Sequence, residues 1–350
     1  MASALAFASG CVPDLGGWEV VIDDTPRPLR DGGRPPGVDA GAQTGGPCGH
    51  PTLFAAAHEL GEGPGRVMRW ELQGAGGLVP CSDLVAEGAF GSLPWAVAPV
   101  SDDLVAVASQ QGVVGVNPIE DRAVWTEAMS GMHPNDAFVI TDRDSRDRVP
   151  VVAWSGVGTS AQLRAPIRLV EVYEPGGGIR RSLSASDLML GSATSMTASP
   201  RVIGEALALN GNVYSLGEVV LNGTGLRTPA LIGPFEDGAA YTISAGANDR
   251  VVWSADLPDG MGGRATGVVH TADAWGGGEI TTQGAGGCGE MDCTPVHAVI
   301  DPSVAQGVVV ICEGSPNWLA TFDLGASTCN VWAQGDALGT RRLSYLAVLE

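Results

Sequence analysis

Histidines and carboxylates stand close together at several points of this sequence, and they are the side chains that could do chemistry. Such groups transfer protons in catalysis, and carboxylates that gather at one place hold hard cations such as calcium. The candidate positions are His58, Glu59 and Glu62, then His133 and Asp136, then Glu290 and Asp292, and lastly Glu313. We expect them to bind a polar ligand or a cation if the fold brings them to one surface, and we predict no cofactor.

Two patterns begin like catalytic motifs and do not continue as one. His58 and Glu59 could open a zinc-protease helix, but no second histidine follows at the required spacing, and the glycines at 61, 63 and 65 disfavour a helix. Ser155-Gly156 would need a helix after the serine to form a nucleophile elbow, and none is predicted there. We therefore predict no catalytic residue, and whether the protein is an enzyme stays open.

The run from Asp142 to Asp147 has oxygen-bearing side chains at alternating positions, as in a calcium loop. However, Arg146 takes a ligand position and the glycine of the bend is missing. We predict a solvated turn without a metal.

The composition is that of a globular and strongly acidic chain. Apolar residues make up 44% and charged residues 17% of the 350 positions; the formal net charge is −20, and all 19 basic residues are arginine. A surface of this sign repels phosphate backbones, so we exclude nucleic acid as a partner. No apolar run approaches the roughly 20 residues of a membrane-spanning helix. A membrane would therefore be reached only through a lipid anchor.

The first eleven residues end in Ala8-Ser9-Gly10-Cys11 after a short apolar stretch. Small residues before a cysteine resemble the lipobox of bacterial lipoproteins, in which the cysteine is acylated and becomes the mature N-terminus. The resemblance implies a lipid anchor on Cys11 and an extracytoplasmic address at the bacterial outer membrane or cell surface. We divide the chain into a signal remnant at 1–11, a Gly/Pro-rich tether at 12–50 and a folded body at 51–350.

The body of the chain repeats a unit of four short strands. Apolar and β-branched runs, separated by glycine, proline, asparagine and aspartate, predict strands rather than helices. Residues 95–128 split into four such runs joined by tight turns, which predicts an up-and-down antiparallel sheet. The unit that starts near Met196 is expected to end with a strand at 228–233. First strands begin near Trp95, Ala137, Met196, Ala240 and His297, at intervals of 42, 59, 44 and 57 residues.

This repeat predicts an all-β fold, a single β-propeller, and it resembles the degenerate propeller repeats of bacterial surface proteins. Three strands are predicted before Trp95, and one strand remains at 341–350. We predict that this last strand pairs with the segment around Leu53–Leu60 and closes the ring, since an unpaired sheet edge invites aggregation. Six blades result, with seven as the alternative because the strand-like run 18–23 is left over. A double β-sandwich is the competing fold.

Seven cysteines are an odd number, and lipidation of Cys11 leaves six that can pair in any of 15 ways. Disulfides form in oxidising compartments, so this count favours a secreted protein. The candidates are Cys48, Cys81, Cys288, Cys293, Cys312 and Cys329. Either Cys288 and Cys293 form a small loop, or bridges join the last blade to the first. In the second case Cys312 lies near Cys288 or Cys293, Cys48 lies near Cys329, and Cys81 has no obvious partner.

Loops of an up-and-down blade alternate between two faces, and the histidines and carboxylates fall on one of them, at a mouth of the central channel. The expected ligand-binding set is His58, Glu59, His133, Asp136, Glu290, Asp292 and Glu313. We predict a non-enzymatic binding or scaffold lipoprotein that recognises an envelope or extracellular protein, a polar small molecule or a glycan through these loops. The alternative is an extracellular propeller hydrolase or lyase that acts on carbohydrate through carboxylates at the mouth.

Overall fold

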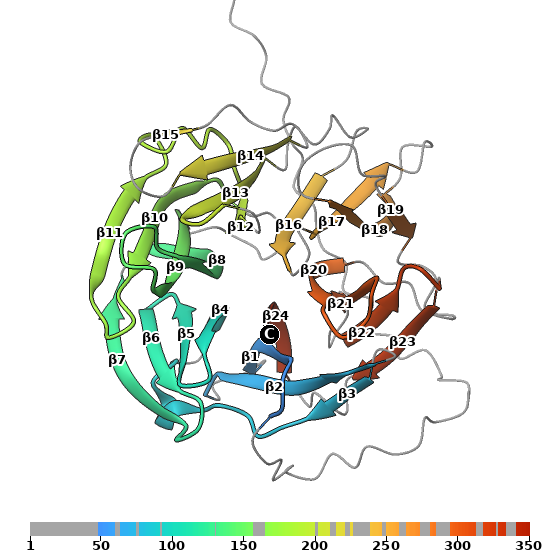
Figure 1. Cartoon of the computed structure of the whole chain (residues 1–350), viewed down its shortest axis with the longest axis horizontal. Coiled ribbons are helices and arrows are strands. Elements are labelled where there is room, and N and C mark those ends of the chain that lie inside the picture. Colours follow the sequence, from blue (N-terminus) through green and yellow to red (C-terminus); the bar gives the residue numbers. More distant parts are fainter. Residues whose placement is uncertain are drawn as a thin grey trace, which may run out of the picture. The chain divides into compact units, whose positions relative to one another are not determined.

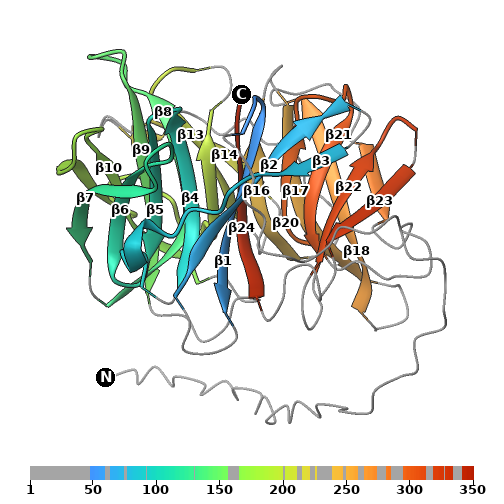
Figure 2. The ribbon, with the colours of Figure 1, turned by 90° about the horizontal axis from the view of Figure 1, so that it is seen from below.

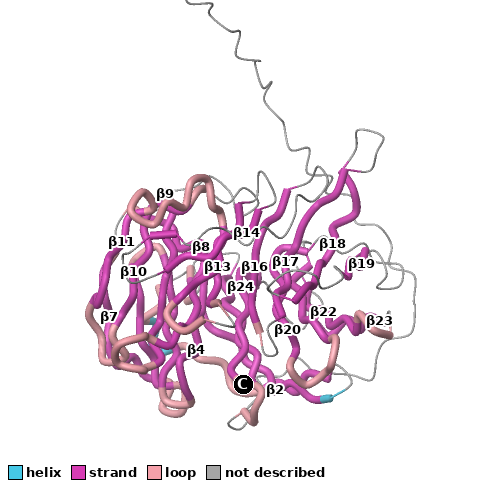
Figure 3. The backbone as a smooth tube through the Cα atoms, turned by 45° about the horizontal axis from the view of Figure 1, so that its top comes forward, coloured by secondary structure: helices cyan, strands magenta, loops and turns pink. Residues whose placement is uncertain are grey.

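The computed structural model describes the chain from Cys48 to Glu350, with gaps, and all described residues belong to the second of two compact units, Asp39–Glu350. The described residues are 48–59, 64–74, 77–91, 93–129, 131–156, 165–199, 202–210, 215–220, 225–226, 239–246, 250–258, 264–273, 281–284, 295–312, 318–326, 328–333 and 341–350. Strands dominate them (Figure 3), and a turn of 3-10 helix, η2 (Ala86–Gly88), follows the third strand.

The described strands form six four-stranded antiparallel sheets. In spatial order they are β24 (Arg341–Leu349), β1 (Thr52–Glu59), β2 (Arg66–Gln73) and β3 (Gly77–Pro80); β4 (Pro94–Ser101), β5 (Leu104–Ser109), β6 (Gly112–Asn117) and β7 (Arg122–Ala128); β8 (Met132–Thr141), β9 (Arg148–Gly156), β10 (Ile167–Tyr173) and β11 (Ile179–Ser184); β12 (Ser195–Ala198), β13 (Glu205–Asn210), β14 (Ser215–Val220) and β15 (Gly225–Leu226); β16 (Ala239–Ala245), β17 (Arg250–Pro258), β18 (Arg264–Asp273) and β19 (Thr281–Gly284); β20 (Pro295–Asp301), β21 (Gly307–Cys312), β22 (Trp318–Asp323) and β23 (Thr328–Ala333).

Burial along each sheet explains why these sequences form strands. Every residue of β5 is buried, so its side chains are covered on both faces of the sheet. In β7, at the far edge of the same sheet, exposed residues alternate with half-buried ones. Apolar runs therefore occupy the inner strands, and alternating runs occupy the rim, as expected for sheets that pack face to face.

Neighbouring sheets share hydrophobic cores. Leu53 of β1 packs in the same cluster as Val309 of β21, and Val151 of β9 packs with Met196 of β12. Each core thus lies between two sheets rather than within one. The sheets are held face to face by burial of apolar surface, which is the dominant favourable term in folding.

The six innermost strands surround a common centre (Figure 1). Each of them contacts the next in the order β24, β4, β8, β12, β16 and β20, and β20 contacts β24. A small cavity of about 140 Å³ between them is lined from every one of these strands, by residues that include Pro99, Ala137, Thr197, Ser244, Val299 and Tyr345. This radial arrangement confirms the prediction of an all-β, propeller-type fold over a two-layered sandwich.

The last strand closes the ring, as predicted. β24 lies beside β1 (Figure 2), and the antiparallel ladder pairs Thr52 with Leu349 and Glu59 with Arg341. A register shift between Ala56 and Ala57 interrupts this ladder. The first sheet is thereby assembled from both ends of the described chain, and β1 is left without an open edge.

One disulfide joins the chain before β1 to the chain after β3. Cys48 and Cys81 are bonded, with their Cα atoms 5.5 Å apart. A bridge between Cys48 and Cys329 is therefore excluded, and the prediction that Cys81 has no partner is wrong. The reason is local: the Gly49 amide donates to Glu71 Oε2 over 3.1 Å, so the lead-in crosses β2 and reaches Cys81 in the same sheet.

Two further cysteines are described. Cys312 and Cys329 are both disulfide-bonded, and they stand opposite Trp318 and Phe322, near the two ends of β22. Cys11, Cys288 and Cys293 lie outside the described residues, as does the run 18–23. Within the part of the chain that is described, no helix is long and apolar enough to cross a membrane.

Candidate functional site

Three side-chain rings lie together at one end of the inner strands. They belong to His58, Trp95 and His133, and we call them the mouth cluster. His58 lies near the end of β1, while Trp95 and His133 lie at the starts of β4 and β8. The indole centroid of Trp95 is 5.3 Å from the His58 ring and 4.5 Å from the His133 ring, and both pairs are tilted. Two predicted site residues from separate sheets thus flank one tryptophan.

His58 is held in its neutral form. Its side chain is buried, and burial together with the positive charge of Arg342 lowers the pKa of the imidazole from 6.5 to about 4. Arg342 stands beside it because the β1–β24 ladder pairs these two positions. At neutral pH the ring therefore has one nitrogen that accepts and one that donates a hydrogen bond.

Two polar atoms of the mouth cluster are buried without a hydrogen-bond partner in the described part of the chain: His58 Nδ1 and Trp95 Nε1. Groups of this kind are rare, since a buried donor or acceptor without a partner costs about 1–3 kcal/mol. They lie on neighbouring rings at the face where the inner strands begin. A ligand with both a donor and an acceptor would satisfy both atoms.

Asp136 lies away from the surface, on the same strand as His133. It is fully buried, and its carboxylate accepts hydrogen bonds from Ser195 Oγ over 3.1 Å and from the Met196 amide over 2.9 Å. Ser195 Oγ in turn accepts the amide of Ile243 over 3.1 Å. This chain of contacts connects β8, β12 and β16, so the observed contacts of Asp136 join three sheets.

The side chains of the other predicted site residues lie outside the part of the chain that the structure describes. Glu59 ends β1 next to His58, and its side chain lies outside the described residues, as do Glu62, Glu290, Asp292 and Glu313. Among the residues that are described, no group of three or more histidine, cysteine, aspartate or glutamate side chains is placed to hold a metal ion. The cation site therefore stays a sequence prediction.

Trp95 and Arg342 were not among the residues predicted from the sequence. Each begins an innermost strand of its sheet, Trp95 that of the second sheet and Arg342 that of the first. All such starts fall at the same face of an up-and-down propeller. The position within the repeat was therefore the signal that could have identified them.

No protein-family model matches the chain, and no curated protein sequence matches it. Solved structures do. A structure of a nidogen/laminin complex matches with a TM-score of 0.54 and 12% identity over 85% of this chain and 97% of that one. A protein of unknown function from Bacteroides caccae matches with a TM-score of 0.53 and 10% identity, over 85% and 98% of the two chains. A hydrazine synthase from Kuenenia stuttgartiensis matches with a TM-score of 0.51 and 14% identity, over 75% of this chain and 72% of that one.

The fold is that of a β-propeller. Identities this low show the arrangement of the backbone and no more, because one fold supports many unrelated functions. The site must therefore be argued from its own residues.

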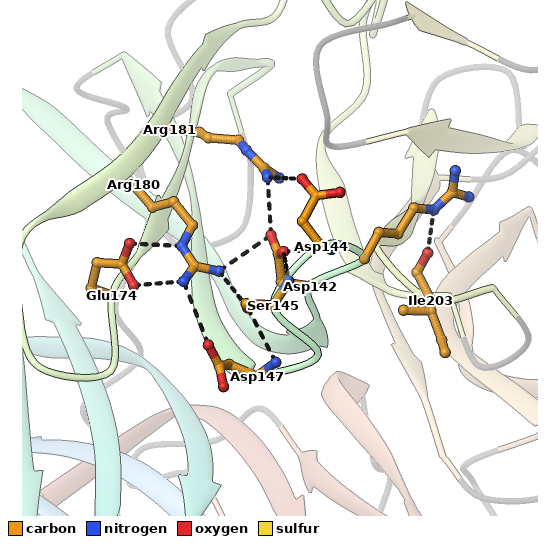
Figure 4. A network of polar contacts seen from close by, with 9 residues as sticks. Asp142, Asp144, Ser145, Asp147, Glu174, Arg180, Arg181 and Ile203 are labelled. Carbon is orange, nitrogen blue, oxygen red and sulfur yellow. Dashed lines mark hydrogen bonds and ion pairs between the residues drawn. The ribbon is translucent and has the colours of Figure 1, made fainter.

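The opposite face of the propeller carries an arginine–carboxylate network on the third sheet (Figure 4). Asp142 is almost fully buried, and its Oδ1 accepts the amides of Asp144 and Ser145 over 2.9 and 3.1 Å. Its Oδ2 lies 3.3 Å from Arg180 and 3.1 Å from Arg181. The prediction of a solvated turn is thus wrong for Asp142, because β11 brings two guanidinium groups onto a turn that looks isolated in the sequence.

These contacts set the charge of Asp142. Burial would raise the pKa of the carboxyl, but the amides of Ser145 and Asp144 and the charges of Arg181 and Arg180 hold it below its usual value. Arg180 also donates to both oxygens of Glu174, over 2.7 and 2.8 Å. The network fixes two hairpin turns of one blade to each other, and we assign it a structural role.

Proposed function

We propose that this propeller is a non-enzymatic binding or scaffold protein and that its binding surface includes the mouth cluster. The observation that carries the proposal is the pair of buried polar atoms, His58 Nδ1 and Trp95 Nε1, without a hydrogen-bond partner among the described residues. A polar ligand or a protein loop that supplies an acceptor to the indole N–H, and to His58 Nδ1 an acceptor or a donor according to the tautomer of the ring, would remove this cost. Trp95 and His133 are partly exposed, and an aromatic ring face suits contact with a sugar or a peptide group.

The scaffold that presents the mouth cluster is, in this proposal, a six-bladed propeller, one blade for each four-stranded sheet. The cyclic contacts of the innermost strands support this count. A rigid ring keeps His58, Trp95 and His133 in place before a ligand arrives. Preorganisation of this kind favours binding, because little side-chain order is lost on association.

We propose an extracellular or envelope protein as the first candidate partner, with a polar small molecule or glycan as the second. One structure of similar fold was determined in a complex of nidogen with laminin, so the fold can present a surface to a protein. The Cys48–Cys81 disulfide supports an oxidising, extracytoplasmic compartment. Attachment to a bacterial membrane through an acylated Cys11 belongs to the same proposal.

The binding test compares His133→Ala with a matched variant on the far face, Glu120→Gln. Both side chains are at least partly exposed, so both variants should fold. Wild-type protein is immobilised and offered purified extracellular proteins and a glycan array, and each ligand found is titrated against both variants. Loss of affinity in His133→Ala alone supports the proposal, and equal affinity in the two variants contradicts it.

Two further measurements are needed. One distinguishes a binding protein from a hydrolase or lyase, and the other tests the lipid anchor on Cys11. Turnover of polysaccharides by the wild-type protein, abolished in Glu59→Gln, would favour the hydrolase or lyase over the binding protein. Mass spectrometry of the mature N-terminus decides the anchor: an unmodified Cys11 in an uncut chain removes it.

A further inference from the structure

A second cavity, of about 460 Å³, lies at the face opposite the mouth cluster, between the first and second sheets. We call it the Arg69 pocket. Volumes of this size are typical of small-molecule sites. Its lining comes from the lead-in to β1, from β1 and β2, from the hairpin turns of the second sheet and from the C-terminal end of β24; the residues that matter below are His50, Phe54, Arg69, Asp102, Ile119 and Leu349.

Arg69 is buried, with 8% of its surface exposed, and its guanidinium has no carboxylate within ion-pair distance in the described part of the chain. Nε and Nη2 donate to the carbonyl and hydroxyl oxygens of Ser82, over 2.7 and 2.8 Å, and Nη1 donates to the Pro118 carbonyl over 3.2 Å. A guanidinium has five N–H groups. One N–H on each Nη atom is left, and each of the two can donate a charge-assisted hydrogen bond to a carboxylate oxygen.

A buried charge without a counter-ion is costly, so buried charges are ordinarily paired. Asp121 and Asp83 act on Arg69 only from a distance, and burial lowers the pKa of the guanidinium in spite of them. Asp121 Oδ1 is already occupied by the amides of Val85 and Ala86, over 2.8 and 2.9 Å. Arg69 lines the cavity, and the negative charges of Asp121 and Asp83 balance its positive charge only in part.

The rest of the pocket is built for an apolar body. Phe54 and Leu349 are buried in its wall, and Ile119 stands at the rim with 70% of its surface exposed. His50 Nε2 lies 2.7 Å from Asp102 Oδ1, and Asp102 is the only carboxylate among the described residues that line the pocket. The Cys48–Cys81 disulfide fixes the lead-in next to Ser82, the residue that orients Arg69.

We propose that the Arg69 pocket binds a free organic acid that has an apolar body and a single carboxylate, which Arg69 holds through its two remaining donors. A singly charged ligand suits a protein of net charge −20, because repulsion grows with each further negative charge. This site lies on the face opposite the mouth cluster, and it does not depend on the proposed function.

The test uses the full chain and 3-phenylpropionate, with 3-phenylpropionamide and 3-phenylpropanol as uncharged analogues, measured by calorimetry and ligand-observed NMR. We expect the acid to bind at least about tenfold more tightly than either analogue, the loss that follows when a charged hydrogen bond is removed. Equal affinities, or no binding of the acid at millimolar concentration, would overturn the proposal. A short peptide that ends in a free Phe carboxylate is the second arm: tight binding of the peptide with none of the acid would overturn the free acid as the ligand.

Two variants connect the affinity to the pocket. Arg69→Gln should abolish the preference for the acid, but it also removes the hydrogen bond to Pro118 that joins the first sheet to the second. Ile119→Asp places a negative charge at the exposed rim, where it should leave the fold intact and weaken binding of the acid more than binding of the amide. The site would be contradicted if a folded Ile119→Asp protein bound the acid with unchanged affinity and if the backbone N–H chemical shifts perturbed by the acid lay outside the pocket.

Discussion

The hydroxyl of Tyr345 on β24 donates a hydrogen bond of 3.0 Å to the carbonyl of Ala137 on β8. β4 lies between these two strands in the ring, so the bond reaches past one sheet to the next. The ring of Tyr345 also lies 4.1 Å from that of His297 on β20, measured between centroids. The strand that closes the propeller is thus anchored to sheets on both sides, and not only through its ladder to β1.

Removal of the Tyr345 hydroxyl should weaken the attachment of β24 to the ring of sheets. Tyr345→Phe keeps the ring but leaves a buried carbonyl with one partner fewer, and we expect the free energy of unfolding to fall by about 1–2 kcal/mol. Urea denaturation followed by tryptophan fluorescence measures it. Tyr345→Leu removes the ring contact as well and should cost more. A Tyr345→Phe protein as stable as the wild type would show that the bond contributes nothing.

The buried imidazole at the mouth should make stability depend on pH. The pKa of His58 is about 4 in the folded protein and 6.5 in its ordinary state. Between pH 4 and 6.5 His58 is protonated in the unfolded chain and neutral in the folded protein. The contribution of His58 to the free energy of unfolding should therefore fall by about 3 kcal/mol as the pH drops from 6.5 to 4, and it should be constant above that window.

Two measurements check the His58 prediction. The C2 proton of the imidazole, assigned by its loss in His58→Gln, should titrate near pH 4 in the folded protein. The slope of stability against pH between 4 and 6.5 should be shallower in His58→Gln than in the wild type. An ordinary titration near 6.5 would contradict the burial of this side chain.

A salt bridge between the third and fourth sheets should be worth more than one on the surface. Arg143 pairs with Glu205, whose side chain is fully buried, and its Nε donates to the Ile203 carbonyl over 2.6 Å. Arg143→Gln should cost about 3 kcal/mol, because it removes a cation that pairs with a buried carboxylate. Arg122→Gln breaks an exposed pair with Glu120 and should cost less than about 1 kcal/mol. Equal losses in denaturation experiments would contradict the difference.

The Cys48–Cys81 bridge encloses a sequence separation of 33 residues. Its loss in the double variant Cys48→Ala, Cys81→Ala should lower the free energy of unfolding by about 3–4 kcal/mol, mainly because the unfolded chain gains freedom. The comparison is made by denaturation without reductant. The variant should also weaken acid binding in the Arg69 pocket, since Cys48 lines it. Unchanged stability would show that the lead-in is held in place by other contacts.

Local patterns in the sequence were enough for most of the fold. Alternating and β-branched runs between turn residues predicted the positions of strands such as β4 to β7, because a strand and its hairpin are decided by neighbouring residues. The weakest repeat is the exception: a fourth strand was expected at 228–233, and the structure places β15 at Gly225–Leu226, with 228–233 outside the described residues. β15 pairs with β14, with Leu226 opposite Val219 and Gly225 opposite Val220.

By itself the sequence determined that the chain is all-β, that its strands come in fours and that its last strand has a partner near its first, since each of these follows from local pattern and from counting strands. Only the tertiary structure decided that His58 and His133 meet at Trp95, that Asp136 ties three sheets together, and that Arg69 faces a cavity. Those contacts join residues of different strands and sheets. They depend on how the sheets pack against one another, a relation that no local pattern in the chain encodes.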